Sequence, residues 1–305
     1  MDSLLSCFPP AMLVERQPHA LIVRTPAKVN LFLEVLAKRP DGYHDIATLM
    51  VTVSLFDTLQ FRDDPSGSVS MTCSNPDLST GPDNLVIRAA QALKRHSGCL
   101  RGAAIHLEKR IPLAAGLAGG SSDAAATLMG LNRLWQLSLP TTQLAKLAGE
   151  LGSDIPFFFS GPAAWCTGRG EIVEPLPIGK PLFLVLVCLP FGLSTAEVYR
   201  GVSLPAEPRS GMEMREALRA GDMEALGRGL HNRLQARAEQ LCPAIALWLA
   251  RLEEQRPAGQ LMSGSGAALF ALCRDQSEAR MVARAMVAGP MTEPRPHVQI
   301  VRSCV

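Results

Sequence analysis

The stretch IPLAAGLAGGSSDAAATL, residues 111–128, joins a glycine-rich loop to the start of a helix rich in alanine and leucine. Small residues in such a loop let backbone N–H groups approach an anion, and the positive end of the helix favours a phosphate there. Ser121 and Ser122 are expected to cap the helix and to offer hydroxyl donors or a magnesium ligand, with Asp123 in its first turn. The loop is neither a Walker A sequence nor a dinucleotide-binding fingerprint. The alternative is a turn that only permits close helix packing.

Predicted strands and helices surround this loop. Apolar and β-branched runs predict strands within residues 20–73, broken by turns such as Pro40-Asp41-Gly42, in a mostly antiparallel sheet. Helical spacing predicts a helix over residues 84–97 that stops at Gly98. The other predicted elements are a strand at 103–108, helices at 122–137 and 141–151, a hairpin around Gly168-Arg169-Gly170, a strand at 182–189, several helices up to 256, a strand-turn-strand at 260–273, a helix at 276–288 and a strand at 297–302. Helices laid over an antiparallel sheet define an α+β protein.

Composition excludes several classes of protein. The chain has 305 residues, 47% of them hydrophobic, which excludes a disordered polymer, and no apolar run is long enough to span a membrane. The net charge is 30 − 28 = +2, so an anion has to be held locally and a nucleic-acid partner is not expected. The eight cysteines are scattered, which favours free, mostly buried thiols in a reducing compartment. The N-terminus lacks a basic leader and a cleavage site, so we expect a cytoplasmic protein.

A cluster of prolines and glycines at residues 175–181 marks a predicted domain boundary. We expect an N-terminal domain over residues 20–179 and a C-terminal domain over residues 180–305. Residues 1–19 are interpreted as a frayed N-terminal extension, in which Met12 is an alternative start.

Three polar residues stand out because of their apolar surroundings. Asp154 follows the helix-ending Gly152 and precedes an apolar run, where a carboxylate can be partly desolvated and serve as a base. Lys28 lies inside a strand-like sequence, where a buried charge needs a partner, and Asn30 shares its face of the strand. The alternatives are a turn cap for Asp154 and an aggregation-blocking lysine on an edge strand for Lys28.

The glycine-rich loop resembles the phosphate-binding motif of the GHMP kinases, which include galactokinase, homoserine kinase, mevalonate kinase and phosphomevalonate kinase. Ala118 stands where that motif often has glycine, and its methyl group is acceptable if the position needs no positive φ. The stretch MSGSGAALFAL, residues 262–272, resembles the third glycine motif of these kinases. Taken alone, this stretch is equally consistent with a tight hairpin turn.

Two further stretches resemble signatures of the kinases that act on 4-diphosphocytidyl-2-C-methyl-D-erythritol. They are TPAKVNLFLEVLAKRPDGYHDIATLM, residues 25–50, and LGSDIPFFFSG, residues 151–161. The resemblance implies a two-domain α+β fold, with an N-terminal domain similar to a ribosomal protein and a C-terminal ferredoxin-like α/β sandwich. It also implies transfer of the γ-phosphate of ATP to the 2-hydroxyl group of that alcohol, a step of the non-mevalonate route to isoprenoids. The implied cofactor is ATP with Mg²⁺ as its counter-ion, and no residue is assigned as a metal ligand.

The resemblance implies a role for each matching residue. Asp154 would be the catalytic base, and Lys28 would orient that base and neutralise phosphoryl charge. The residues implied at ATP are Asn84, Lys109, Pro112, Leu113, Ala114, Ala115, Gly116, Leu117, Ala118, Gly119, Gly120, Ser121 and Ser122. The residues implied at the alcohol substrate are Asn30, Tyr43, His44, Thr195, Tyr199, Gly264 and Ser265. Tyr43 and Tyr199, from different domains, would sandwich the cytosine, and His44 would read its edge.

Other interpretations stay open at this point. Asn84 and Thr195 could cap helices, Lys109 and His231 could be surface residues, Tyr43 and His44 could close a hairpin, and Tyr199 could pack in the core. A GHMP kinase for homoserine or mevalonate is the alternative enzyme, although those substrates have no base for Tyr43 and His44 to recognise. A nucleic-acid-binding module is disfavoured by the balanced charge and the 5% aromatic content. We expect a monomer or weak dimer that binds small molecules and no membrane.

Overall fold

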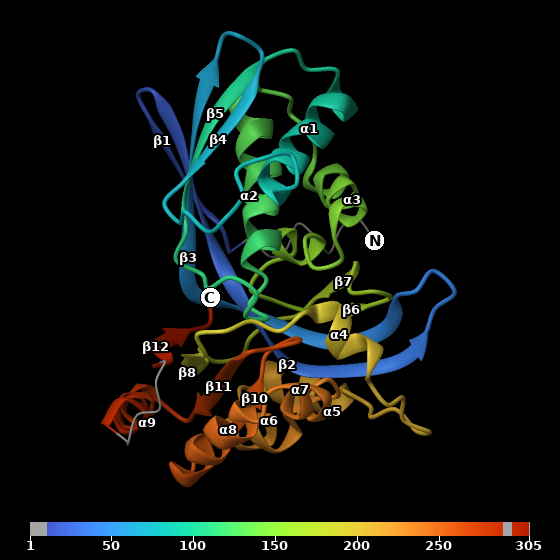
Figure 1. The fold of residues 1–305 in the computed structure, drawn as a ribbon, viewed down its shortest axis with the longest axis vertical. Helices are drawn as coiled ribbons and strands as arrows, with labels where there is room; N and C mark the ends of the chain where they lie inside the picture. The colour runs from blue at the N-terminus through green and yellow to red at the C-terminus, as the bar shows by residue number, and fades with distance from the viewer. Residues whose placement is uncertain (1–10, 289–294, 305) are drawn as a thin grey trace. The chain divides into compact units, whose positions relative to one another are not determined.

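The computed structural model describes residues 11–288 and 295–304 (Figure 1). The chain forms two compact units. The first unit contains the chain up to Ala27 together with Leu55–Ile111 and Ala118–Gly161. The second unit contains Lys28–Ser54, Pro112–Leu117 and the chain from Pro162 onward.

The first unit combines an antiparallel framework with helices. Strand β1 (Leu13–Gln17) pairs with the start of β2 (Ala20–Lys38), and the end of β3 (His44–Asp64) pairs with β5 (Gly102–Glu108), all antiparallel. Strand β4 (Val69–Cys73) pairs with β5 in parallel. The helices are α1 (Leu85–Ser97), α2 (Gly119–Leu134), α3 (Thr141–Leu151) and a 3₁₀ turn at Pro156–Phe159, and Figure 1 shows α1, α2 and α3 gathered on one side of these strands.

Local chemistry explains the ends of α1. The Asn84 side chain accepts a hydrogen bond from the backbone N–H of Val86 at 2.8 Å, which satisfies one of the free donors of the first turn. Gly98 then ends the helix in the left-handed conformation, at φ 67°. The predicted limits of this helix, and the helix cap considered for Asn84, are therefore confirmed.

The second unit is a sheet with helices packed against it. Its four strands run in the order β10 (Gly259–Met262), β11 (Ala268–Cys273), β8 (Phe183–Cys188) and β12 (His297–Arg302), each antiparallel to its neighbour. Strand β6 (Ala163–Thr167) pairs with the first part of β3 and with β7 (Ile172–Pro175), and β9 (His231–Asn232) pairs in parallel with β2. The helices are α4 (Thr195–Arg200), α5 (Met212–Ala220), α6 (Met223–Gly229), α7 (Gln235–Leu241), α8 (Ala244–Glu254) and α9 (Gln276–Ala288). Val185, Val187, Trp248, Leu252 and Leu269 are among the residues that join sheet and helices in one core.

Several predicted limits change in the structure. Leu13–Gln17 form strand β1 and are not a frayed extension, while residues 1–10 lie outside the described residues. The compact units interleave along the chain, with the last change at Gly161–Pro162, and β2 and β3, with 19 and 21 residues, each contribute to both units. The domain limits at residues 20–179 and 180–305 therefore stay a prediction.

The cysteines agree only in part with the prediction of free, mostly buried thiols. Seven cysteines fall within the described residues and all seven are free, but only Cys166, Cys188 and Cys273 are buried. Cys7 lies outside the described residues.

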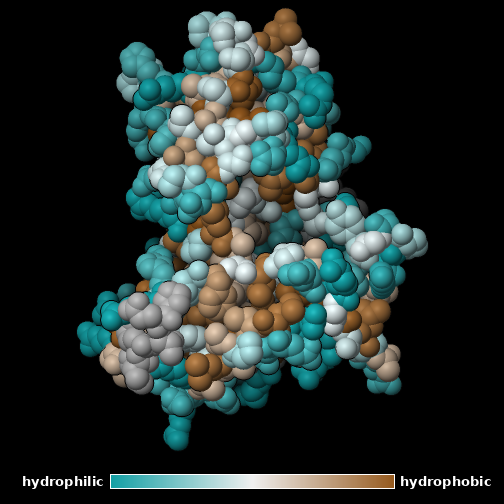
Figure 2. Space-filling view, viewed as in Figure 1, coloured by the Kyte–Doolittle hydropathy of each residue, from teal (hydrophilic) through white to brown (hydrophobic). Residues whose placement is uncertain are grey.

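In Figure 2, apolar side chains appear as separate patches among polar ones. In the part of the chain that the structure describes, no helix has the length and apolar character needed to cross a membrane.

Candidate active site

Lys28 is a buried cation at a fixed position of strand β2 in the second unit. It is only 3% exposed. Its ammonium group donates to Asn30 Oδ1 at 2.6 Å and to the carbonyl oxygen of Gly116 at 3.0 Å. Its backbone N–H donates to the carbonyl oxygen of Leu117 at 3.1 Å. The prediction that this lysine is buried and partnered is confirmed, and the alternative of an exposed lysine that blocks aggregation is wrong because the ammonium is buried and donates within the protein.

Asn30 lies next to Lys28 on the same face of β2, as strand geometry predicts. Both ends of its side-chain amide are engaged within the second unit. Oδ1 accepts from Lys28, and Nδ2 donates to Thr48 Oγ1 at 2.8 Å, whose hydroxyl in turn donates to the carbonyl oxygen of Phe32. The amide therefore orients the lysine, and its contact with a substrate stays a prediction.

The third glycine motif forms the turn between β10 and β11, so the hairpin interpretation is correct for its local geometry. The backbone N–H of Gly266 donates to the carbonyl oxygen of Ser263 at 3.0 Å. The hydroxyl of Ser263 also donates to the Gly116 carbonyl at 3.1 Å and accepts from the backbone N–H of Asn30 at 3.3 Å. This turn thus contacts both the glycine-rich loop and the strand that carries Lys28.

Thr195 does not cap helix α4. The cap is Ser194, whose side chain accepts from the backbone N–H of Glu197. The Thr195 hydroxyl instead lies 2.8 Å from the hydroxyl of Ser265. Two residues assigned to the substrate from the sequence are therefore neighbours in the second unit.

The glycine-rich loop has a positive φ at three positions, and at the two alanines among them the backbone is strained. Ala114, Gly116 and Ala118 have φ values of 50°, 74° and 54°. A Cβ atom on Gly116 would lie 2.2 Å from the carbonyl oxygen of Ser263, so glycine is required there. The expectation that Ala118 needs no positive φ is wrong. An alanine in this region costs about 1 kcal/mol or more, a strain that other contacts must offset.

The two serines of the motif do not cap helix α2. Ala118 occupies the cap position without a side-chain hydrogen bond, and the helix begins at Gly119. The hydroxyl of Ser122 is fully buried, donates to the carbonyl oxygen of Pro26 at 2.6 Å and lies 2.5 Å from Thr25 Oγ1. It is therefore engaged by the protein, and its role as a magnesium ligand stays a prediction. The first N–H groups of α2 are left for an anion, since these groups have no partner within a helix.

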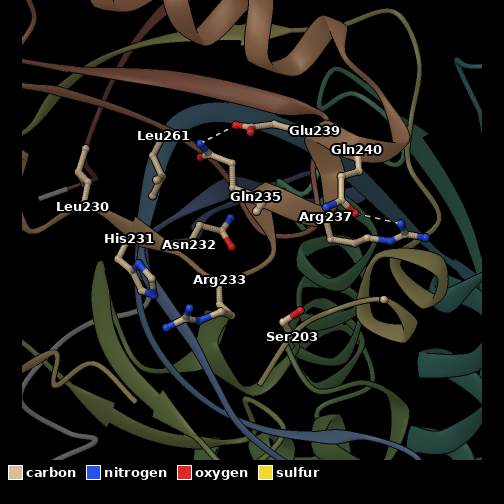
Figure 3. Close-up of a pocket in the computed structure, with 12 residues that line it drawn as sticks. Ser203, Leu230, His231, Asn232, Arg233, Gln235, Arg237, Glu239, Gln240 and Leu261 are labelled. Atoms are coloured by element: carbon tan, nitrogen blue, oxygen red, sulfur yellow. Dashed lines mark hydrogen bonds between the residues drawn. The ribbon is translucent and has the colours of Figure 1, made fainter. Parts of the chain in front are cut away.

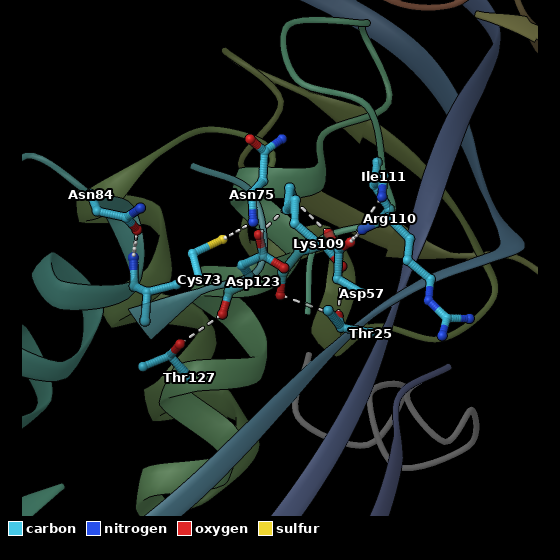
Figure 4. Close-up of polar contacts among 12 residues, drawn as sticks. Thr25, Asp57, Cys73, Asn75, Asn84, Lys109, Arg110, Ile111, Asp123 and Thr127 are labelled. Atoms are coloured by element: carbon cyan, nitrogen blue, oxygen red, sulfur yellow. Dashed lines mark hydrogen bonds and ion pairs between the residues drawn. The ribbon is translucent and has the colours of Figure 1, made fainter. Parts of the chain in front are cut away.

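Lys109 lies in a buried cluster of three ionisable groups in the first unit (Figure 4). Its ammonium donates to Asp57 Oδ2 at 2.5 Å and to Asp123 Oδ2 at 2.7 Å, with side-chain exposures of 2% for the lysine and 0% and 3% for the carboxylates. The surface-lysine alternative is therefore wrong. A Cβ atom on Gly119 would lie 2.8 Å from this ammonium nitrogen, so the first residue of α2 rests on the cluster.

The two carboxylates of this cluster differ in their surroundings. Asp57 Oδ1 accepts from the backbone N–H groups of Arg110 and Ile111, at 2.6 and 2.8 Å. Asp123 Oδ1 is buried without a partner. Burial raises the pKa of Asp123 to about 8, even though the attraction of Lys109 acts to lower it. The resemblance assigned Lys109 to the nucleotide, and that role stays a prediction. In this structure the ammonium of Lys109 binds the carboxyl groups of Asp57 and Asp123.

The aromatic residues assigned to the cytosine all belong to the second compact unit. The rings of His44 and Tyr199 lie 5.3 Å apart at 34° to each other. Tyr199 packs against the hydrophobic core, whereas Tyr43 is 53% exposed with the Arg169 guanidinium 4.9 Å from its ring centre. The backbone N–H of Arg39 donates to the carbonyl oxygen of Tyr43, so Tyr43 also closes the predicted hairpin. Burial lowers the pKa of His44.

Asp154 belongs to the first unit. It follows Gly152, where α3 ends, and it precedes the 3₁₀ turn at Pro156–Phe159. Its side chain is half-buried, as the apolar run after it suggested. The backbone N–H of Ile155 donates to the carbonyl oxygen of Gly152, which makes this segment a tight turn.

Sequence reasoning missed Glu34, the fully buried carboxylate at the centre of an ion cluster in the second unit. Arg233 donates to it through Nε and Nη2 at 2.7 and 2.8 Å, and the backbone N–H of Arg209 donates at 3.0 Å. Burial alone would raise the pKa of Glu34, but these hydrogen bonds outweigh it and lower the pKa to about 2. The signal available in the sequence was its spacing from Lys28: residues six apart on one strand lie on the same face, so a second charged residue was predictable on the face that carries Lys28.

His231 is another residue whose surroundings the sequence left open. Its Nε2 lies 3.2 Å from Glu34 Oε2, and its ring is 5.3 Å from that of Phe32. It is half-buried, and burial lowers its pKa despite the carboxylate. His231 also lines a cavity of about 450 Å³ in the second unit, together with Asn232 and Arg233 (Figure 3).

Comparisons with known proteins now define the class. Residues 84–162 match the family described as GHMP kinases N terminal domain, and residues 214–290 match GHMP kinases C terminal. The solved structure of a homoserine kinase from Cytophaga hutchinsonii is similar at a TM-score of 0.72 over 95% of this chain, and its 17% identity supports the fold alone. The fold and the motifs therefore define a GHMP kinase, with the α+β architecture that the resemblance implied.

More similar proteins narrow the class to one family. A curated 4-diphosphocytidyl-2-C-methyl-D-erythritol kinase from Pelotomaculum thermopropionicum is 44% identical over 84% of this chain and 90% of the relative. One from Exiguobacterium sibiricum is 42% identical over 85% of this chain and 91% of the relative. The crystal structure of a 4-(cytidine 5'-diphospho)-2C-methyl-D-erythritol kinase has a TM-score of 0.76 and 34% identity, covering 92% of this chain and 98% of that chain. The chain belongs to the 4-diphosphocytidyl-2-C-methyl-D-erythritol kinase family.

Proposed function

We propose that this protein transfers the γ-phosphoryl group of ATP to the 2-hydroxyl group of 4-diphosphocytidyl-2-C-methyl-D-erythritol and releases ADP, in the non-mevalonate route to isoprenoids. The observation that carries the proposal is the buried ammonium of Lys28, held between Asn30 and the Gly116 carbonyl of the glycine-rich loop. A fixed cation beside a phosphate loop suits a reaction whose catalysis is mostly positioning and charge stabilisation. The substrate comes from the names of the relatives.

ATP is assigned to residues 112–122, which would hold its phosphates, and to Asn84 and Lys109, which would lie near its adenine and ribose. This assignment is supported by the start of α2, a helix of 16 residues, because the first N–H groups of a helix have no partner within it and its positive end favours an anion. We propose that Mg²⁺ arrives with the nucleotide. Among the described residues no group of three or more acidic, histidine or cysteine side chains could hold a metal ion, and the carboxylates of Asp57 and Asp123 already share the ammonium of Lys109.

Asp154 is assigned as the base. As the oxygen of the substrate hydroxyl forms its bond to the γ-phosphorus, the bond from that phosphorus to the bridging oxygen of ADP breaks, and the hydroxyl proton passes to the Asp154 carboxylate. Lys28 neutralises charge that develops on the phosphoryl oxygens. The half-buried place of Asp154 in a tight turn supports this role, because a base has to be held in position beside the proton that it accepts.

Tyr43, His44 and Tyr199 are assigned to the cytosine, with Asn30, Thr195, Gly264 and Ser265 at the remainder of the substrate. The contact between the rings of His44 and Tyr199 supports a shared aromatic surface for a base. We further propose that the protein acts in the cytoplasm, as a monomer or weak dimer, without a nucleic-acid or membrane partner.

A panel of alcohols tests the function. Purified protein is incubated with ATP and, separately, with the cytidyl alcohol, homoserine and mevalonate, and ADP release is followed together with the mass of the product. We expect turnover of the cytidyl alcohol alone, with one phosphate added. Faster turnover of homoserine or mevalonate would overturn the substrate assignment, and no ADP release with any alcohol would overturn the kinase itself.

A further inference from the structure

Asn232 is a buried amide whose hydrogen bonds all go to backbone of the second unit (Figure 3). Its Nδ2 donates to the carbonyl oxygens of Met262 and Gly264, at 2.7 and 2.8 Å. Its Oδ1 accepts from the backbone N–H of Leu234 at 3.0 Å. The residue is 7% exposed, so these bonds form out of contact with most solvent. An amide can donate twice and accept at the same time, which a carboxylate cannot do.

The two carbonyl groups that Asn232 holds lie on either side of Ser263. Asn232 therefore fixes the turn of the third glycine motif around Ser263, whose hydroxyl forms hydrogen bonds outside the turn. Ser263 Oγ donates to the Gly116 carbonyl at 3.1 Å and accepts from the backbone N–H of Asn30 at 3.3 Å. The turn and the glycine-rich loop are also in close steric contact, since a Cβ atom on Gly116 would lie 2.2 Å from the Ser263 carbonyl oxygen.

The Gly116 carbonyl connects the turn of the third glycine motif to Lys28. The same oxygen that accepts from Ser263 accepts from the Lys28 ammonium at 3.0 Å. A Cβ atom on Gly264 would lie 3.3 Å from the Lys28 nitrogen, so the turn also borders the ammonium directly. A shift of the turn would therefore change the position of the lysine and of the loop together.

We propose that Asn232 is a positioning residue for phosphoryl transfer, which acts by holding the turn at 262–264 and, through Ser263 and Gly116, the ammonium of Lys28. The inference rests on the proposed function, in which Lys28 stabilises the transferring phosphoryl group. Displacement of such a group by about 1 Å costs on the order of 10²-fold in rate. Asn232 itself needs no contact with either substrate.

Asn232→Asp tests the inference with almost no change in size. The carboxylate replaces a double donor and faces two carbonyl oxygens, so it repels the turn that the amide held. We expect kcat to fall about 10- to 100-fold while KM for the alcohol changes little. Protonation of the introduced carboxylate restores one donor, so the ratio of the variant's kcat to that of the wild type should rise as the pH is lowered. A ratio near one at every pH would overturn the inference.

Asn132→Asp is the matched control. Asn132 Nδ2 donates to the carbonyl oxygen of Leu139 at 2.9 Å and Oδ1 accepts from the Leu139 backbone N–H at 3.0 Å, an amide on backbone in the first unit. This variant should lose stability without the loss of kcat. If both variants lower kcat equally, the effect is general destabilisation and the inference fails.

Ser263→Ala keeps the test decisive if Asn232→Asp does not fold. It removes the hydroxyl that joins the turn to Gly116 and leaves the bonds of Asn232 in place. We expect the same fall in kcat with normal folding, and wild-type kcat in this variant would overturn the inference. If the wild-type protein prefers another alcohol, the proposed substrate is wrong, but the same comparison of variants can be made with that alcohol.

Discussion

Replacement of Lys109 by methionine is the most informative perturbation, because it separates the buried cluster from a role at the nucleotide. Lys109→Met keeps the length and apolar stem of the side chain but removes the ammonium shared by Asp57 and Asp123. The side chains of all three residues are at most 3% exposed. The variant would leave two carboxyl groups buried without the ammonium, and removal of one partner from a buried ion pair costs about 3–5 kcal/mol. We expect a loss of that size in the free energy of unfolding.

The pH dependence of that loss follows from the geometry. Burial raises the pKa of Asp123, and loss of the ammonium removes the attraction that lowers it, so the folded variant binds more protons than the unfolded chain. Stability then falls as pH rises, and it is highest below the pKa of an unfolded carboxyl group. Asp123 should take up the first proton, because its Oδ1 has no partner whereas Asp57 accepts two backbone N–H groups.

Urea unfolding of wild type and variant between pH 5 and pH 8 measures both effects. The double variant Lys109→Met with Asp123→Leu removes one stranded charge and should recover part of the loss. Binding of a non-hydrolysable ATP analogue is measured on the same samples. A stability loss below about 1 kcal/mol, together with a large loss of ATP affinity, would refute the reasoning, because it would show that the ammonium serves mainly the nucleotide.

Four further outcomes are expected. Glu34→Gln removes a carboxylate whose pKa is lowered from 4.5 to about 2, so it should lower the free energy of unfolding in urea by about 3 kcal/mol at pH 7. This loss should disappear as the pH falls from 4.5 toward 2, and an equal loss at pH 2 would contradict the prediction. Asp154→Asn should lower kcat by about 10² to 10⁴ with an unchanged melting temperature, and near-normal turnover would exclude it as the base. Gly120→Val places its Cβ atom in ordinary van der Waals contact with Leu85, 3.6 Å from Cδ1, so the fold should tolerate it. The variant should bind an ATP analogue about tenfold more weakly in calorimetry, or by ~1.4 kcal/mol, whereas unchanged affinity would favour the packing interpretation. Tyr43→Ala should raise KM for the cytidyl alcohol, with CMP a better competitive inhibitor of the wild type than UMP; equal inhibition would misplace the cytosine site.

The sequence by itself determined the elements whose signals are local. Asn84 and Gly98 define α1 because a cap and a left-handed stop need only neighbouring backbone. The helix at 276–288 and the strand at 297–302 were predicted with the limits that the structure shows, since periodicity and breakers lie within each segment. The glycine-rich loop was recognised in the same way, from the size of its residues and the helix that follows.

Only the tertiary structure decided which charges share a buried environment. Glu34 meets a partner 199 residues away in Arg233, and Asn232 meets the Gly264 carbonyl 32 residues away. The surface lysine considered at 109 and the cap considered at Ser122 proved wrong for the same reason. Whether a polar group is capped, paired or exposed depends on which strands and loops pack against it, and a short window of sequence does not contain those partners.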